Sequence, residues 1–395
     1  MTNASNQFAS ISDFDDKATE LAQTRQHLHA HPELSFAEHE TAAFVAERLE
    51  RWGYEVTRNV GGLGVVGRLS QGSGGRSIAI RADMDALLIE EVPGLPYASR
   101  APGKMHACGH DGHTTMLLGA AEYLARTRHF NGTVNLVFQP AEEAGKGSGA
   151  QAMIADGLFE RFPCDAIFGL HNHPGAPVGS FLMRAGPLMA ASDTVTIKVT
   201  GRGGHASRPH LTVDPIVVVA NIVMTLQTVV SRNIDPTETA VVTVGTIHGG
   251  TAANVIPERA EIAVSVRSFL PRVRDVLEQR IRGVAVSIAQ AHGATVDIDY
   301  ERGYPVVHNT EAETAFATAV VTELVGQDKV SVCPLIPGSE DFSYFLEHKP
   351  GCFLRLGNGE DSAILHSPKY DFNDGNLTVG SALWARLAER FLASA

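Results

Sequence analysis

Short apolar runs bounded by glycines alternate with helical segments along the first half of the chain. The runs at 64–69, 77–82, 133–138 and 166–170 are rich in residues that favour strands. A helical pattern at 111–127 separates two of them, and Asp111 is its predicted N-cap. Strands that alternate with helices indicate an α/β fold, so we predict a central, mostly parallel sheet flanked by helices.

The pattern changes after about residue 190. A strand, helix, strand, strand, helix and strand follow one another, which is the order of a ferredoxin-like unit. The α/β pattern then resumes and ends in a helix predicted at 375–393. We therefore expect one α/β domain, formed by residues 1–190 and 305–395, that is interrupted by a smaller α+β domain at 191–304. The six predicted elements of the smaller domain are 193–200, 213–231, 239–248, 259–269, 271–292 and 295–301.

Composition narrows the class of partner and the compartment. The chain has 395 residues, and its 32 Lys and Arg against 44 Asp and Glu give a formal net charge of −12, which argues against nucleic-acid binding. The first 16 residues lack the pattern of a secretory signal, and the apolar stretch at 215–230 is too short and too polar to span a membrane. Four widely spaced cysteines fit a reducing compartment. We expect a cytoplasmic protein without a membrane partner.

Chemically versatile side chains follow the predicted strands. Ligands of open α/β sheets bind beyond the carboxyl ends of the strands, so segments that are remote in sequence can converge there on one site. The segments are Asp83 to Asp85, His106 to His113, Pro140 to Glu143, His171 to His173 and the loop that contains His366.

The residue types in these segments point to metal chemistry. Thiolate, imidazole and carboxylate are the usual ligands of zinc and related divalent ions, and a thiolate can bridge two cations. Cys108 and His110 stand one residue apart in a glycine-flanked loop. A cysteine and a histidine at this spacing are, by themselves, more often ordinary core or surface residues than metal ligands. Two adjacent glutamates after a strand are likewise most often solvent-exposed loop residues. Together with Glu142 and Glu143 they suit hydrolysis, in which one carboxylate binds metal and its neighbour takes the proton of the attacking water.

The motifs RADMDAL, HACGHDGH, PAEE, GLHNHP, GRGGHAS, ANVIP and GSEDF, in this order, resemble the dinuclear metallo-aminoacylase family. They are most similar to its branch of hippurate hydrolases and plant indole-acetyl-amino-acid hydrolases, over a span from about Arg25 to Phe391. The resemblance implies two divalent metal ions per chain, zinc or manganese, with cobalt or nickel as alternatives. It implies that Cys108 bridges them and that four residues complete their coordination, namely His110, Glu143, His171 and His366.

The same resemblance assigns further roles. Glu142 becomes the general acid and base, and Asp85 orients a ligand from behind. Asp83 stands where more distant relatives place a metal histidine, which puts its own ligation in doubt. Glu340 and Asp341 become supporting residues. His106, His113 and His173 are expected to orient loops or ligands.

The inserted domain resembles the family's lid and dimerisation domain, which implies a homodimer, with a homotetramer as the alternative. The resemblance implies that His205 reaches the active site of the partner subunit and stabilises the oxyanion that forms when water attacks the amide. Without the resemblance, the favoured interpretation is that His205 supports a glycine-rich turn. Asn254 and Arg267 resemble positions that contact substrate, and a guanidinium suits an α-carboxylate. A surface ion pair is the alternative for Arg267.

The expected reaction is hydrolysis of the amide bond of N-acyl-L-amino acids, such as hippurate, to a carboxylic acid and a free amino acid. The closest alternative is a dipeptidase or carboxypeptidase with the same mechanism. A binding module that has lost catalysis is disfavoured, because every ligand and the general base are present in the chain.

Overall fold

A computed structural model describes residues 8–92 and 94–393, so the start of the stretch inspected for a secretory signal, residues 1–7, lies outside the described residues. The chain divides into two compact units. We call them the larger unit (Met1–Gly186, His308–Pro334 and Asp341–Ala395) and the smaller unit (Pro187–Val307 and Leu335–Glu340).

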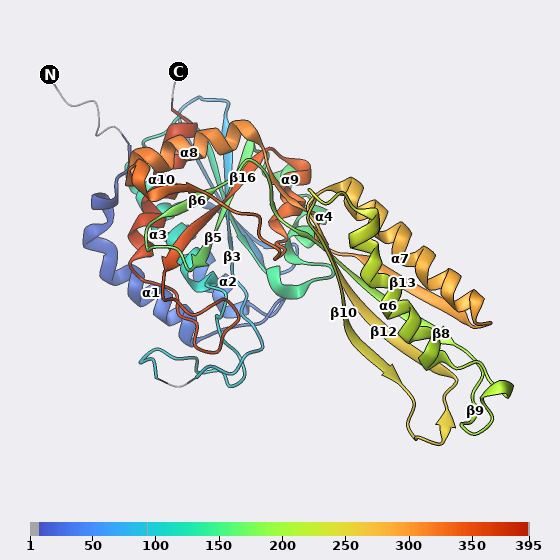
Figure 1. The fold of residues 1–395 in the computed structure, drawn as a ribbon. Coiled ribbons are helices and arrows are strands. Elements are labelled where there is room, and N and C mark those ends of the chain that lie inside the picture. The colour runs from blue at the N-terminus through green and yellow to red at the C-terminus, as the bar shows by residue number, and fades with distance from the viewer. Residues whose placement is uncertain (1–7, 93, 394–395) are drawn as a thin grey trace. The chain divides into compact units, whose positions relative to one another are not determined.

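A twisted eight-stranded sheet runs through the larger unit (Figure 1). Its central strands β4, β3, β5 and β16 are parallel to one another, whereas the pairs β1–β2, β2–β4 and β16–β6 are antiparallel. The central strands are almost entirely buried, as expected for a sheet covered on both faces. In sheet order the strands are β1 (Glu55–Val60), β2 (Gly64–Gln71), β4 (Gly132–Gln139), β3 (Ser77–Asp83), β5 (Ala166–Pro174), β16 (Gly351–Gly359), β6 (Phe181–Met183) and β15 (Val330–Val332).

Helices flank this sheet and confirm the predicted α/β class. Helices α3 and α10 pack on each other, and their buried faces join the apolar core of the sheet. Helices α4 and α9 contact each other as well as the sheet. The helices of the larger unit are α1 (Ala18–Ala30), α2 (His39–Arg51), α3 (His110–Thr127), α4 (Gly149–Ala155), α5 (Leu158–Arg161), α8 (Glu311–Val325), α9 (Phe342–His348) and α10 (Asn376–Phe391), with short 3-10 turns η2 (Ile11–Lys17), η3 (Glu142–Ala144) and η5 (Gln327–Lys329).

The smaller unit has the predicted ferredoxin-like order. Its antiparallel sheet runs β10, β12, β8, β13, and helices α6 and α7 cover one face (Figure 1). Alternate residues of β8 and β12 are buried, and they form the core with the apolar stripes of both helices. The elements are β8 (Ala191–Thr200), β9 (Gly204–His205), η4 (Pro209–Leu211), α6 (Pro215–Asn233), β10 (Ala240–Gly249), β11 (Val255–Ile256), β12 (Arg259–Ser268), α7 (Pro271–Ala291) and β13 (Thr295–Arg302), and the short strands β7 (Gly186–Met189) and β14 (Val307–Asn309) pair with each other.

The start of α3 differs from the prediction. The helix begins at His110, and its N-cap is Gly109 in the left-handed region, with φ 92°. Asp111 is therefore not the cap; it lies in the first turn, where its carboxylate contacts His29. A glycine is needed at position 109 for a second reason, since a Cβ there would lie 2.3 Å from Asn172 Nδ2.

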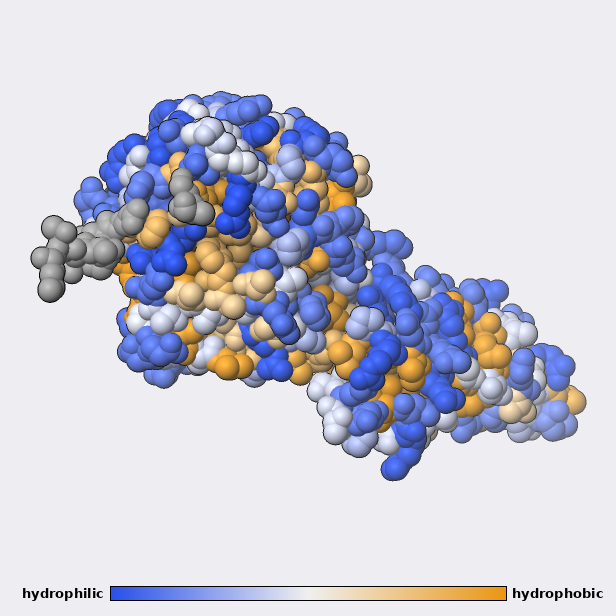
Figure 2. All heavy atoms as spheres, turned by 90° about the horizontal axis from the view of Figure 1, so that it is seen from above, coloured by the Kyte–Doolittle hydropathy of each residue, from blue (hydrophilic) through white to orange (hydrophobic). Residues whose placement is uncertain are grey.

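Helix α6 is apolar along most of its length. Among the described residues it is the one helix that has the length and composition of a membrane span, a test that core helices of soluble proteins also pass. One face of α6 packs in the core of the smaller unit, through Val218, Val219, Ile222, Leu226 and Val229. Apolar side chains stand among polar ones over the surface in view in Figure 2.

Candidate metal centre

The predicted metal-binding segments lie at one edge of the large sheet. In the parallel register Asp83 of β3 pairs with Gln139 of β4, and Arg81 pairs with Gly169 of β5. This register brings the segment after β4, which carries Glu142 and Glu143, level with Asp85 and His171. The backbone N–H groups of both glutamates donate to the Asp85 carboxylate, at 3.1 and 3.0 Å.

Five side chains form two overlapping groups of three. The ligand atoms of Cys108, His110 and His171 lie within 4.8 Å of one another, and so do those of Cys108, Glu143 and His366. Cys108 is the member that the two groups share. A thiolate placed in this way can contact two cations at once, whereas each imidazole offers one nitrogen to one cation.

The buried histidines present their Nε2 atoms to this cluster. His110 Nδ1 donates to the backbone carbonyl of Asp85 at 2.8 Å, and its buried Nε2 has no hydrogen-bond partner among the described residues. His171 Nδ1 donates to the carbonyl of Asn172 at 2.8 Å, and its Nε2 lies 3.2 Å from Cys108 Sγ. A hydrogen bond at one ring nitrogen fixes the tautomer and leaves the other nitrogen free to bind metal.

The electrostatics of the cluster also fit a cation. Burial raises the pKa of the Cys108 thiol well above its usual range, and the nearby charges of Glu143 and Glu142 raise it further. His366 Nε2 lies 3.2 Å from Glu143 Oε1, and this contact raises the pKa of His366. Sulfur, nitrogen and carboxylate oxygen are a donor set for zinc and related ions. A divalent cation would therefore neutralise the negative charge that is concentrated here.

Asp85 connects several parts of the site. Besides the two glutamate N–H groups, its carboxylate accepts from Ser35 Oγ at 2.7 Å and lies 3.3 Å from His110 Nδ1. Burial alone would raise the pKa of Asp85, but the contacts with His110 and Ser35 hold it below its usual value. The carboxylate is thus ionised, and it orients both the His110 ring and the Glu142–Glu143 backbone.

Asp83 has both carboxylate oxygens engaged elsewhere. Oδ2 accepts from Arg81 Nη1 at 2.7 Å, and Oδ1 lies 2.6 Å from His113 Nδ1. His113 Nε2 in turn accepts the backbone N–H of Asn172 at 3.1 Å, so Nδ1 carries the proton and donates to Asp83. Asp83 also forms a group of possible metal ligands with His110 and His113, whose ligand atoms lie within 4.8 Å of one another.

The residues expected to support the site have different surroundings. Asp341 is buried and accepts from Gln139 Nε2 and Arg81 Nη2, at 2.8 and 3.1 Å, and Glu340 is buried beside it in sequence. His173 Nδ1 lies 3.4 Å from Arg355, and burial lowers the pKa of His173 to about 4. Both ring nitrogens of His106 are buried and have no hydrogen-bond partner among the described residues.

Two of the three predicted lid residues lie next to each other in the smaller unit. His205 pairs with Val255 across strands β9 and β11, and the carbonyl of Asn254 accepts the N–H of Ala206. Both His205 and Asn254 are exposed. Ser207 donates its N–H and hydroxyl to His205 Nδ1, which leaves the proton of the neutral ring on Nε2.

Arg267 lies on β12 and is partly buried. Burial lowers its pKa, and in the described part of the chain it makes no ion pair. The alternative of a surface ion pair for Arg267 therefore finds no support in these contacts.

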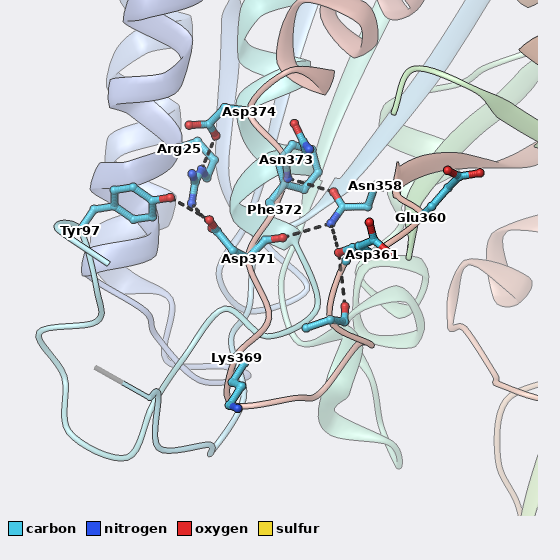
Figure 3. A pocket seen from close by; sticks show the side chains of 13 residues that line it. Arg25, Tyr97, Asn358, Glu360, Asp361, Lys369, Asp371, Phe372, Asn373 and Asp374 are labelled. Carbon is cyan, nitrogen blue, oxygen red and sulfur yellow. Dashed lines mark hydrogen bonds and ion pairs between the residues drawn. The ribbon is translucent and has the colours of Figure 1, made fainter. Parts of the chain in front are cut away.

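A polar pocket of about 570 Å³ adjoins the loop that follows His366 (Figure 3). Arg25 of α1 donates to Asp371 and Asp374 of this loop, at 2.9 and 2.7 Å. The Tyr97 hydroxyl donates to Asp371 at 2.8 Å. None of the five candidate ligands lines the pocket. Its walls thus anchor the His366 loop to α1, outside the metal cluster.

Several buried residues at the site were not predicted. Glu38 accepts the N–H of Ala141 at 2.8 Å, and Ala141 adopts a left-handed conformation, φ 53°, immediately before the two glutamates. Burial raises the pKa of Glu38 to about 7. Asn172 and Tyr370 are also buried at the site, where the Tyr370 hydroxyl donates to Asn172 Oδ1 at 2.8 Å. Asn172 belongs to the motif GLHNHP. Glu38 and Tyr370 lie outside the motifs, and nothing in the neighbouring sequence distinguishes them from an ordinary surface glutamate and an ordinary core tyrosine.

Comparisons with known proteins identify the family of the chain. The family model described as peptidase family M20/M25/M40 matches residues 79–390. The chain is 44% identical to a hippurate hydrolase of Campylobacter jejuni subsp. jejuni, over 95% of this chain and 98% of that protein. It is 38% identical to thermostable carboxypeptidase 2 of Saccharolobus solfataricus, over 94% and 95%. The crystal structure of a dinuclear metal-binding M20 peptidase from Bacillus subtilis superimposes with a TM-score of 0.84, at 35% identity, over 96% and 99% of the two chains.

The fold and these matches define a metal-dependent hydrolase. The chain belongs to peptidase family M20/M25/M40. The resemblance noted in the sequence is thereby confirmed, as is the fold class.

We predict that Asp85→Asn weakens metal binding, because an amide can accept only one of the two glutamate N–H bonds and places a donor against the other. Loss of such an orienting group typically lowers metal affinity by about 10- to 100-fold. Competition with a chromogenic chelator measures this affinity. Ser35→Ala is the matched control, since it removes a single bond to the same carboxylate and should change affinity by less than about threefold. Equal affinities for Asp85→Asn and the wild type would contradict the orienting role.

Proposed function

We propose that this hydrolase cleaves the amide bond of N-acyl-L-amino acids at a dinuclear metal centre. Two divalent ions would be held by Cys108, His110, Glu143, His171 and His366, with the Cys108 thiolate available to both. The observation that carries this proposal is the pair of three-residue groups that have only Cys108 in common. The thiolate favours zinc, while the nitrogen and oxygen ligands also accept manganese, cobalt or nickel.

The chain's own residues supply proton transfer. Divalent ions, when bound, lower the pKa of water from about 15.7 towards about 7. Glu142 is buried next to Glu143, and its backbone is fixed by Asp85. Its carboxylate takes the proton of the attacking water and later delivers that proton to the leaving amine. The strained conformation of Ala141, held by Glu38, sets the direction in which Glu142 and Glu143 leave β4.

The smaller unit provides contacts to the substrate. Arg267 binds the α-carboxylate of the amino acid, in agreement with its partial burial and its lack of an ion pair among the described residues. Asn254 contacts the substrate beside His205. The Nε2–H of His205 donates to the oxyanion that forms when water attacks the amide, and this histidine serves the active site of a second subunit.

A peptidase is the second candidate function. The thermostable carboxypeptidase relative, 38% identical, favours it. The mechanism is the same, and the two functions differ only in whether an acyl or an aminoacyl group precedes the amide. The first experiment is therefore elemental analysis of the purified protein, with hydrolysis assays on N-acyl amino acids and dipeptides. Two ions per chain with faster cleavage of N-acyl amino acids support the proposal, and faster cleavage of dipeptides supports the alternative.

Assembly and compartment are part of the same proposal. We expect a homodimer through the smaller unit, in which β10 is an open sheet edge and α6 exposes Val217 and Met224, the latter 70% exposed. A homotetramer is the alternative. The four cysteines are unpaired and buried, in agreement with a cytoplasmic location.

Analytical ultracentrifugation tests the assembly. We predict a dimer in solution, because unpaired strand edges and exposed apolar helix faces are stabilised by pairing with a second copy. A strict monomer with full activity would rule out a role of His205 across subunits.

We predict that Glu142→Gln retains two metal ions and loses turnover by a factor of about 10² to 10⁴, the usual contribution of a general acid and base. Glu143→Gln is the matched control in the adjacent position, and it should lose metal as well as turnover. Metal analysis and steady-state kinetics of both variants distinguish the roles. Turnover near the wild-type rate in Glu142→Gln would contradict the assignment.

We predict that Arg267→Ala raises KM for substrates with a free α-carboxylate by about 10- to 100-fold, equivalent to the roughly 1.5–3 kcal/mol of a hydrogen bond to a charged group. The α-amide analogues of the same substrates, which lack the charge, should be affected far less. An equal effect on both series would indicate that Arg267 serves the fold of the smaller unit.

A further inference from the structure

Asn172 joins three segments of the larger unit that each carry a candidate ligand. It follows His171 directly in β5, and its side chain is fully buried. Asn172 Nδ2 donates to the carbonyl of Cys108 at 2.6 Å. Asn172 Oδ1 accepts from the hydroxyl of Tyr370 at 2.8 Å, and Tyr370 lies four residues after His366.

The backbone of Asn172 is engaged as well. Its N–H donates to His113 Nε2 at 3.1 Å, and its carbonyl accepts from His171 Nδ1 at 2.8 Å. Through His113 the first of these bonds continues to Asp83 at the end of β3. All four polar atoms of this one residue therefore contact segments that border the metal cluster.

The packing around Asn172 leaves little freedom. A Cβ at Gly109 would lie 2.3 Å from Asn172 Nδ2 and 2.7 Å from Tyr370 Oη, so the Cys108 loop approaches both side chains as closely as a glycine allows. Tyr370 is fully buried, and the opposite side of its loop is held by Arg25 through Asp371 and Asp374. The His366 loop is thus fixed from two sides, and it also contacts the Cys108 loop directly, because the N–H of His366 donates to the carbonyl of Ala107 at 2.8 Å.

We propose that Asn172, with Tyr370, is a positioning residue that sets the spacing between Cys108, His171 and His366, and hence the geometry of both metal sites. The inference rests on the proposed metal centre. Asn172 does not touch an ion itself; it acts on Cys108 through the peptide carbonyl, on His171 through the ring nitrogen that faces away from the cluster, and on His366 through Tyr370. One residue thereby couples the ligands of the two three-residue groups.

Two variants test this inference by readouts other than activity. Tyr370→Phe removes a single hydroxyl, and Asn172→Asp keeps the acceptor for Tyr370 but places an oxygen against the Cys108 carbonyl. Each variant should lower the affinity for zinc about 10-fold or more, measured by chelator competition. Each should also shift the visible bands of the cobalt-loaded protein, which report the thiolate and imidazole geometry around the ion.

Matched controls separate positioning from general stability. Tyr54→Phe removes a buried hydroxyl that donates to the Ala121 carbonyl. Asn309→Asp alters a buried asparagine whose amide group bonds Arg184 and Phe353. Both controls should lower the melting temperature of the metal-free protein as much as their counterparts, while the zinc affinity and the cobalt spectrum stay unchanged.

Each outcome decides the inference. Wild-type zinc affinity and an unchanged cobalt spectrum in Tyr370→Phe would overturn it, and this variant decides alone if Asn172→Asp does not fold. Equal losses of affinity in the control variants would also overturn it, because they would show a general effect of destabilisation. A wild-type protein that binds no metal would instead contradict the proposed function.

Discussion

The parallel register of β3, β4 and β5 is the constraint on which the site depends. Asp83 stands opposite Gln139, and Arg81 stands opposite Gly169. Two residues beyond Arg81 and Gly169 come Asp83 and His171, so carboxylate and imidazole leave neighbouring strands at the same level. A shift of the register by one residue would turn every one of these side chains to the opposite face of the sheet.

Buried charge is balanced by a small number of directed contacts. Arg81 is fully buried and donates to Asp83, Gln139 and Asp341, which come from three different parts of the chain. A buried ion pair of this kind adds little net stability, because desolvation offsets much of the attraction. Removing one partner is costly, however, and the network therefore favours a single arrangement of the strand ends over alternatives of similar burial.

The fold and the candidate ligands could be predicted from the sequence, whereas the contacts that orient those ligands could not. Apolar runs and their spacing are local properties, so the central sheet, the ferredoxin-like unit and the helix at the C-terminus were evident in the sequence. The contacts that orient the site are not local. Glu38 lies 103 positions from Ala141, and Tyr370 lies 198 positions from Asn172. The wrong N-cap at Asp111 has a similar origin: the close approach of Asn172 and Tyr370 requires a glycine at position 109, which is the N-cap of the helix that begins at His110.

The larger unit is assembled from three separate stretches of chain, and this has a consequence for biosynthesis. Strand β16 lies between β5 and β6 in the finished sheet, yet it is made some 170 residues after them, roughly 10–35 s later at ordinary elongation rates. His366 and Tyr370 emerge later still. Until the last stretch is made, the sheet lacks the strand that separates β5 from β6, and the candidate metal centre lacks one of its five ligands, so the larger unit reaches its complete sheet and site only at the end of synthesis.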